Sequence, residues 1–215
     1  MPKNNQIIAL SCSPSRGRNS DTMLDHFIKG INEVEGIEVE KIYLNDIPFD
    51  YYCYENGSQP GDNEQEFNDL ARKIKEADAL IISTPTYNFS VPAKLKNFID
   101  RIRFIALDLS KKNKLGQPVG LLGHLRTYFI VSGGTPSWAQ KMLFFGFPPF
   151  WLRSVFLYYG ANCIGAYYSG DVKTFENVKI LNKCRKKGSA YAKKVSKGKC
   201  NSLLEKIFWR PPQKD

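Results

Sequence analysis

Short apolar runs alternate along this chain with longer segments whose apolar residues recur every three to four positions. The short runs are typical of buried strands, and the longer segments are typical of helices that bury one face. The expected strands are residues 6–12, 38–44, 79–83, 128–132 and 163–168. Helices are expected from an N-cap at Asn19 or Ser20 to a point before Gly36, and over 64–77, 92–106, 138–159 and 174–196. An irregular segment at 46–63 and a long loop at 108–124 complete the pattern.

Strands that alternate with helices pair in parallel, because each helix carries the chain back across the sheet as a right-handed crossover. Five strands in this order predict an α/β, flavodoxin-like fold, which is a doubly wound five-stranded parallel sheet with helices on both faces. The composition suits one globular core, since 42% of the 215 residues are hydrophobic and 24% are charged. We expect a domain over residues 1–172, followed by a basic C-terminal helix and tail over 173–215.

The net charge of +10 is unevenly distributed along the chain. Residues 171–215 hold 13 Lys or Arg and 4 Asp or Glu, whereas residues 1–170 hold 18 and 17. A nucleic-acid enzyme would carry its basic groups around a cleft in the body, so we expect no nucleic-acid partner. The basic C-terminal region is either a solvated helix face or a surface that binds an anionic partner.

Targeting and metal signals are weak. The apolar stretch 7–10 is too short for a secretion signal or a membrane span, so we expect a cytoplasmic protein. The five cysteines lie at least sixteen residues apart and form no CxxC pair, and the two histidines have no second ligand at metal-binding spacing. We expect reduced thiols and no metal site.

Three loops follow the first, third and fourth expected strands, at 11–20, 84–91 and 132–138. In an open parallel sheet the ligand lies outside the carboxyl ends of the strands, at the point where the strand order reverses. We therefore expect these three loops to form one binding site.

The first of these loops combines hydroxyl, amide and guanidinium groups just before a helix. Its candidate ligand-binding residues are Ser11, Ser13, Arg16, Arg18, Asn19 and Ser20. The first N–H groups of a helix lack internal acceptors and carry a partial positive charge, so this loop suits an anion. It has neither a P-loop nor a dinucleotide fingerprint, which favours a single phosphate. The alternative is an ordinary Ser/Arg turn before a capped helix.

The second and third loops supply flat rings and an approachable backbone. The candidate residues are Pro85, Thr86, Tyr87, Asn88 and Phe89 in the second loop and Ser132, Gly133 and Gly134 in the third. Glycines let the backbone come close to a ligand. Together the loops predict a site for a planar heteroaromatic cofactor.

The sequence from Pro85 to Asp100 resembles the Pro-x-Tyr-Asn-Phe-x-x-Pro-x-x-Leu-Lys-x-x-x-Asp motif of one enzyme family. This is the FMN-dependent NAD(P)H azoreductase and quinone reductase family of flavodoxin-like enzymes. The segments 116–122 and 151–160 are similar to stretches that flank the third loop in that family, and the resemblance spans residues 6–172. The related NAD(P)H-dependent FMN reductases share a similar first loop and the Pro-x-Tyr-Asn motif.

The resemblance implies that FMN is the cofactor. The first loop would surround its phosphate through Ser13, Arg18, Asn19 and Ser20, the second would contact the isoalloxazine and ribityl groups through Thr86 to Phe89, and the third would contact the pyrimidine side of the ring. Two features of this sequence differ from the patterns of the related enzymes. Ser132 stands where the azoreductase pattern usually has Arg, and Cys53 is alone where iron-sulfur members carry a compact set of cysteines, so we expect no cluster.

The implied activity is a ping-pong oxidoreduction, in which NADH or NADPH passes hydride to flavin N5 and a quinone, azo compound or similar small acceptor then takes its place. No side chain is required as a catalytic acid or base, and the chain shows no Ser-His-Asp or paired-carboxylate arrangement. One alternative is a flavodoxin-type FMN electron carrier between redox proteins. Another is an FMN-binding regulatory module.

Two further segments suggest partners. Nine of the 22 residues from Trp138 to Tyr159 are aromatic, which predicts a homodimer interface that also walls the flavin pocket, or else a large monomeric core. Near the C-terminus, residues 203–210 add apolar side chains to the basic region. This combination predicts either weak contact with an anionic membrane or docking of the tail on the protein itself.

Overall fold

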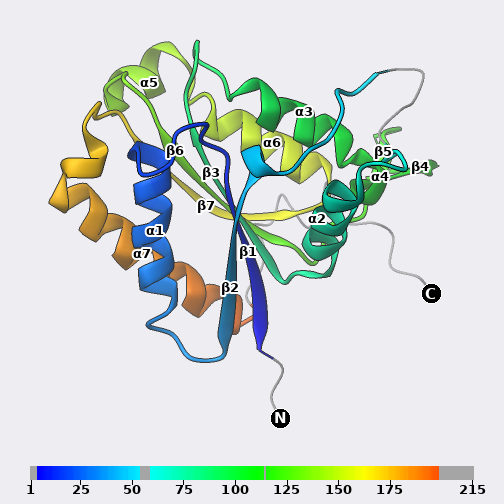
Figure 1. The fold of residues 1–215 in the computed structure, drawn as a ribbon, viewed down its shortest axis with the longest axis horizontal. Helices are drawn as coiled ribbons and strands as arrows, with labels where there is room; N and C mark the ends of the chain where they lie inside the picture. The colour runs from blue at the N-terminus through cyan, green and yellow to red at the C-terminus, as the bar shows by residue number, and fades with distance from the viewer. Residues whose placement is uncertain (1–3, 54–58, 114, 199–215) are drawn as a thin grey trace.

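The computed structural model describes residues 4–53, 59–113 and 115–198 and is built around a five-stranded sheet (Figure 1). Its strands are β1 (Asn5–Ser11), β2 (Ile37–Tyr43), β3 (Ala79–Pro85), β6 (Arg126–Ser132) and β7 (Asn162–Ser169). They lie in the order β2-β1-β3-β6-β7, and every neighbouring pair is parallel. The predicted flavodoxin-like doubly wound sheet is confirmed, with its reversal of strand order between β1 and β3.

Helices cover both faces of the sheet (Figure 1). One face packs on α1 (Asn19–Ile31) and α7 (Val178–Ser196), and the other on α2 (Gln65–Glu76), α3 (Ala93–Arg101) and α6 (Pro149–Tyr158). The central strand β3 is buried throughout residues 79–84 and supplies both cores. Ile81 belongs to the core on the α1 side, whereas Leu80 and Ile82 belong to the core on the α2 side. This double burial explains why residues 79–82 form a continuous apolar run.

The basic helix α7 packs tightly along α1. A Cβ atom at Gly30 would lie 1.9 Å from the carbonyl oxygen of Arg185, and one at Gly188 would lie 1.9 Å from that of Phe27, so only glycine permits this approach. The inner face of α7 is buried through Cys184 and other apolar side chains, while its lysines face outward. In the described part of the chain, no helix is both long enough and apolar enough to cross a membrane.

The expectation of a loop at residues 108–124 is wrong. The strands β4 (Leu107–Lys112) and β5 (Pro118–Gly120) form a separate antiparallel pair there. Residues 109–112 of β4 are all exposed. This strand therefore lacks the alternation of apolar and polar residues by which a strand is recognised in a sequence.

Several expected helices are shorter or divided. The helix expected at 92–106 is divided into α3 and α4 (Arg103–Ala106), and the stretch at 138–159 into α5 (Ser137–Leu143) and α6. Between α5 and α6 the chain turns through two residues with positive φ, Phe145 at 50° and Gly146 at 74°. Short 3-10 turns, η1 (Leu44–Asp46) and η2 (Thr174–Glu176), follow β2 and precede α7. Cys200 and the predicted anchor at 203–210 lie outside the described residues.

Candidate functional site

The three predicted loops meet at the carboxyl end of the sheet and enclose a cavity of about 270 Å³. Its walls are formed by Ser13, Ser15, Arg18, Asn19, Ser20, Pro85, Thr86, Tyr87, Ser132, Gly133, Gly134 and Val172. The second and third loops are joined by a backbone hydrogen bond of 2.7 Å, in which Thr86 N–H donates to the Ser132 carbonyl oxygen. The cavity thus lies beside the reversal point between β1 and β3, where a ligand site is expected.

Ten of the fourteen predicted site residues lie on the wall of this cavity. Two wall residues outside the prediction are Ser15 and Val172. Ser15 belongs to the same hydroxyl-rich loop, so its type and position could have indicated it. Val172 comes from the turn after β7, and neither its type nor its position in the sequence signals a ligand contact.

Ser11 and Arg16 do not line the cavity. The Ser11 hydroxyl is buried and donates to an oxygen of Asp21 at 2.8 Å. Arg16 is ion-paired with Asp46, and its guanidinium lies 4.2 Å from the centre of the Tyr43 ring. Ser11 therefore supports the loop from inside, and Arg16 fastens the outer side of the loop to the end of β2.

Asn88 and Phe89 form a tight turn at the rim of the cavity. The backbones of Tyr87 and Ser90 exchange two hydrogen bonds of 2.9 Å, and the two residues between them have φ values of 47° and 62°. These left-handed conformations cost energy in residues other than glycine. The Phe89 ring stacks on that of Phe144, with 4.3 Å between the ring centres. The turn leaves Tyr87 on the cavity wall and about half exposed.

Helix α1 points its N-terminus at the cavity. Asn19 and Ser20 are not N-caps as expected, because the N-cap is Arg18 and no side chain caps the first turn. The Asn19 side chain instead donates to the Val172 carbonyl oxygen at 3.0 Å and accepts from Phe175 N–H at 3.1 Å. Without a capping side chain, the first N–H groups of α1 keep their partial positive charge for a ligand.

A buried carboxylate, Asp21, organises the first loop. It accepts hydrogen bonds of 2.8 Å from Gly17 N–H and from Ser11, and its carboxylate lies 2.8 Å from the ammonium of Lys41. Burial by itself would raise the pKa of the Asp21 carboxyl, but the hydrogen bonds from Lys41, Gly17 and Ser11 outweigh burial and lower the pKa. Sequence reasoning missed Asp21, because an acid is not expected inside an anion-binding loop.

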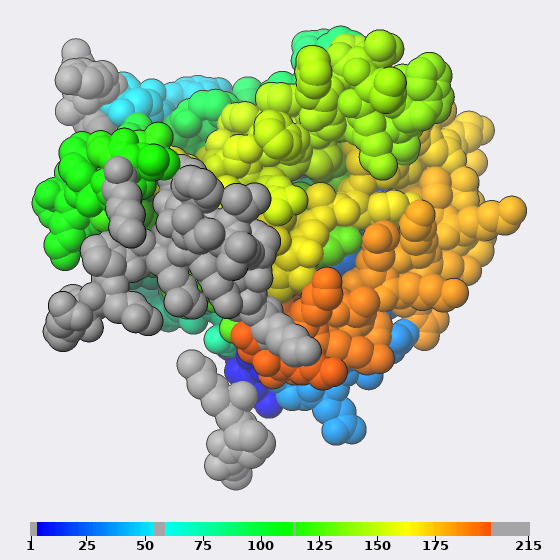
Figure 2. Space-filling model, turned by 180° about the vertical axis from the view of Figure 1, so that it is seen from behind, coloured from blue at the N-terminus to red at the C-terminus, as the bar shows by residue number. Residues whose placement is uncertain are grey.

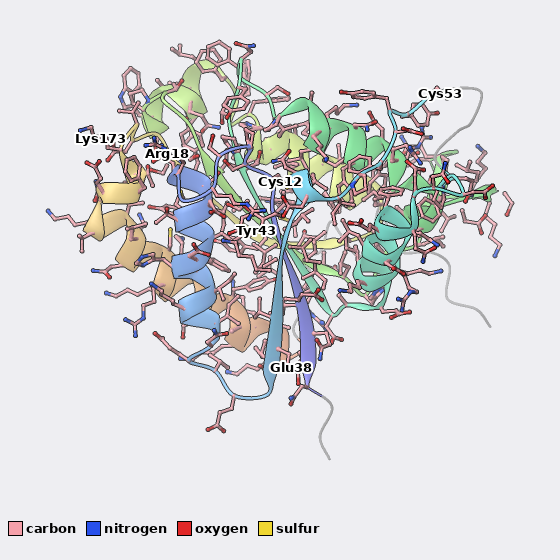
Figure 3. The ribbon with its side chains drawn as sticks, in the orientation of Figure 1. Cys12, Arg18, Glu38, Tyr43, Cys53 and Lys173 are labelled. Atoms are coloured by element: carbon pink, nitrogen blue, oxygen red, sulfur yellow. The ribbon has the colours of Figure 1, made fainter. Side chains whose placement is uncertain are left out.

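Two residues that line the cavity, Ser20 and Thr86, each have a buried hydroxyl oxygen with no hydrogen-bond partner among the described residues. An unpaired buried polar group costs roughly 1–3 kcal/mol, so two of them on residues that line one cavity favour a polar ligand there. Arg18, labelled in Figure 3, is exposed at the same end of α1, and its guanidinium lies 5.4 Å from the centre of the Phe175 ring. Hydroxyl donors, a helix N-terminus and a nearby guanidinium together suit a phosphate group.

Beyond the rim lies an exposed apolar surface on α5 and the start of α6, which we call the α5–α6 surface. It consists of Trp138, Met142, Leu143, Phe145, Phe147 and Phe150, which are 39–80% exposed. Phe145 is the most exposed of these and has a left-handed backbone. An apolar surface of this kind is typical of an interaction site.

Comparison with known protein sequences gives one family and several relatives. The family model for NADPH-dependent FMN reductase matches residues 5–135. The chain is 42% identical over 76 residues to an FMN-dependent NADH:quinone oxidoreductase of Metamycoplasma arthritidis, which covers 35% of this chain and 39% of that protein. It is 30% identical over 157 residues to the protein of the same name in Mycoplasmopsis synoviae, covering 72% of this chain and 77% of that one.

Comparison with solved structures supports the fold. An azoreductase from Bacillus anthracis superposes on this chain with a TM-score of 0.68 at 16% identity, covering 88% of this chain and 99% of that one. At this identity the likeness speaks for a shared flavodoxin-like architecture. The matched segment 5–135 contains the first two cavity loops and most of the third.

Proposed function

The chain belongs to the NADPH-dependent FMN reductase family, and from that membership we propose that it is an FMN-dependent NAD(P)H oxidoreductase. Its electron acceptor would be a small molecule, such as a quinone or an azo compound. The observation that carries the proposal is the pair of unpartnered buried hydroxyls, Ser20 and Thr86, on the wall of one cavity. Ligand oxygens would satisfy both.

The α1 side of the cavity would hold the FMN phosphate. Ser20 Oγ and the first N–H groups of α1 would donate to phosphate oxygens, and the exposed guanidinium of Arg18 would add positive charge. Ser13 Oγ already donates to the Ser15 carbonyl oxygen at 2.8 Å, so its role would be to fix the shape of the loop.

The second and third loops would position the ring system. Thr86 Oγ1 would offer a hydrogen bond, Tyr87 offers a flat wall, and Gly133 and Gly134 line the cavity without side chains of their own. FMN, when bound, supplies hydride transfer, and the protein supplies position and electrostatics. The nicotinamide and the acceptor would react with the flavin in turn, as a ping-pong cycle requires.

The expected homodimer, cytoplasmic location and membrane contact also remain proposals. The exposure of the apolar residues of the α5–α6 surface supports a homodimer in which the second copy covers this surface and completes the rim of the cavity. A cytoplasmic location and weak contact of the basic C-terminal region with anionic membranes remain predictions. The segment that would make most of that contact lies outside the described residues.

An anaerobic flavin titration tests the activity. FMN-loaded protein should lose its flavin absorbance on addition of NADH or NADPH and regain it on addition of a quinone. An electron carrier would keep its absorbance until a separate reductase is added, and a regulatory module would respond to neither. Either of these two results would refute the proposed enzyme.

A further inference from the structure

Strand β7 lies at the edge of the sheet, and within the described part of the chain it pairs only with β6. Beside it lies a hollow of about 710 Å³ between α5 and α7, separate from the cofactor cavity. Figure 2 shows this hollow between the yellow-green and the orange segments. A strand edge of this kind presents unpaired backbone N–H and C=O groups and pairs readily with another extended chain.

At Ala166 the strand presents a small side chain to the hollow. Ala166 lines the hollow and is exposed, whereas the space that a Cβ of Gly165 would need is taken by the Tyr128 ring of β6, at 2.9 Å. Tyr167 and Tyr168 line the hollow on either side of the strand. An extended segment could therefore approach the edge at Ala166.

The walls of the hollow carry three lysines. Lys183 and Lys187 lie one turn apart on α7, with their ammonium groups 5.3 and 5.2 Å from the centre of the Tyr167 ring, and Lys141 lies on α5. No carboxylate among the described residues forms an ion pair with any of these three. Asp171 is at the end of the hollow, and its carboxylate accepts hydrogen bonds from Lys173 N–H and from Asn177.

We propose that this hollow, which we call the β7 groove, binds an extended acidic segment of a partner protein, which adds to the sheet as a strand beside β7. Alternate side chains of an added strand point to opposite faces. Acidic residues on one face would meet Lys183 and Lys187, and those on the other would meet Lys141. Backbone pairing would give affinity, and the lysines would select for negative charge.

Charge disfavours two other occupants. A second copy paired edge to edge would bring its own α7 lysines against these. The chain's own residues 199–215 carry four Lys or Arg and two Asp or Glu, so they are not acidic overall. An acidic segment of a different protein complements the groove best.

Fluorescence anisotropy with a labelled peptide tests the proposal on the full-length protein. The probe is a peptide of about eight residues with the repeat Glu-Glu-Val-Val, which places Glu on both faces of an extended strand, and the control replaces each Glu with Gln. We expect saturable binding of the Glu peptide that weakens as salt rises, and no binding of the Gln peptide. Equal binding of both peptides, or of neither, would overturn the proposal.

Two matched variants locate the site. The double variant Lys183→Gln/Lys187→Gln should bind the Glu peptide about tenfold more weakly. Lys193→Gln/Lys194→Gln, which removes the same charge from exposed positions of the same helix outside the groove, should bind as the wild type does. Equal losses in the two variants would overturn the assignment of the groove. Circular dichroism confirms that both variants are folded.

The mode of binding needs its own test. A Glu peptide with N-methyl groups on alternate backbone amides cannot pair as a strand, so it should lose binding. Ala166→Trp should also abolish binding by filling the groove without a change of charge. If the methylated peptide bound unchanged, or if peptide binding required self-association of the protein in sedimentation velocity, strand addition by a foreign segment would be refuted.

Discussion

The two sides of the candidate cofactor cavity differ in how their side chains are held. On the α1 side, Asp21 is buried and binds Ser11, Gly17 and Lys41, so the loop has its shape before any ligand arrives. On the α5 side, Phe145 is 80% exposed and its backbone is left-handed. The α1 side is organised by its own residues, whereas the residue after Phe144 at the end of α5 is left largely exposed within the described part of the chain.

The largest expected effect comes from removing the organiser of the α1 side. Asp21→Ala should lower the free energy of unfolding by about 3 kcal/mol, because it leaves Gly17 N–H, Ser11 and the partly buried Lys41 short of a partner. FMN should be lost as well. Urea unfolding and flavin content measure both effects, and full stability in this variant would contradict the role given to Asp21.

The same carboxylate should make stability depend on pH. The lowered pKa of Asp21 means that its contribution is complete above the ordinary aspartate value of about 4 and is lost as the pH falls through the lower folded-state pKa. Urea midpoints measured from neutral to acidic pH should therefore fall less steeply for Asp21→Ala than for the wild type. Parallel curves would show that other groups control the acid response.

The next effect concerns the ligand. Asn19→Ala/Ser20→Ala should weaken FMN binding about thirtyfold, because Ser20→Ala removes a donor at the phosphate end and Asn19→Ala frees the start of α1 from Val172 and Phe175, each loss being worth about 1 kcal/mol. Ser20→Ala alone should not reduce the stability of the ligand-free protein, because Ser20 Oγ has no partner there to lose. Thr22→Ala, on the same helix outside the cavity, is the control. Unchanged FMN affinity in the folded double variant would disprove the phosphate assignment.

On the α5 side, a substitution should raise the free energy of unfolding instead of lowering it. Phe145→Gly relieves a left-handed backbone and removes an exposed ring, so the free energy of unfolding should rise by about 1 kcal/mol after the cost of a more flexible unfolded chain. Self-association measured by analytical ultracentrifugation should weaken in the same variant. A less stable protein would mean that the Phe145 ring already has a stabilising partner within one chain.

The smallest effect should come from the outer ion pair. Asp46→Asn breaks the pair with Arg16, in which both side chains are more than half exposed, so stability should change by less than about 0.5 kcal/mol. FMN affinity should hardly change. A large loss of FMN would place Arg16 among the ligand-binding groups after all.

The sequence allowed the order of strands and three loops of the site to be predicted, because β3 begins with the apolar run 79–82 and the loops contain recognisable polar and glycine positions. Other features have no such signal. The strand at Leu107–Lys112 is exposed over most of its length, so no pattern of burial marks it. Asp21 on α1 acts through contacts with Ser11 of β1 and Lys41 of β2, which only the fold brings together. The unpartnered state of Ser20 and Thr86 depends on their neighbours in space.

The contact between α1 and α7 also determines when the cofactor site can exist during synthesis. Asn19, near the start of the chain, is held by Val172 and Phe175, and Gly30 packs on the backbone of Arg185. A nascent chain that has grown only as far as β6 has the first two loops but lacks the turn and helix that hold α1. The site is therefore complete only after α7 has been synthesised and has packed on α1.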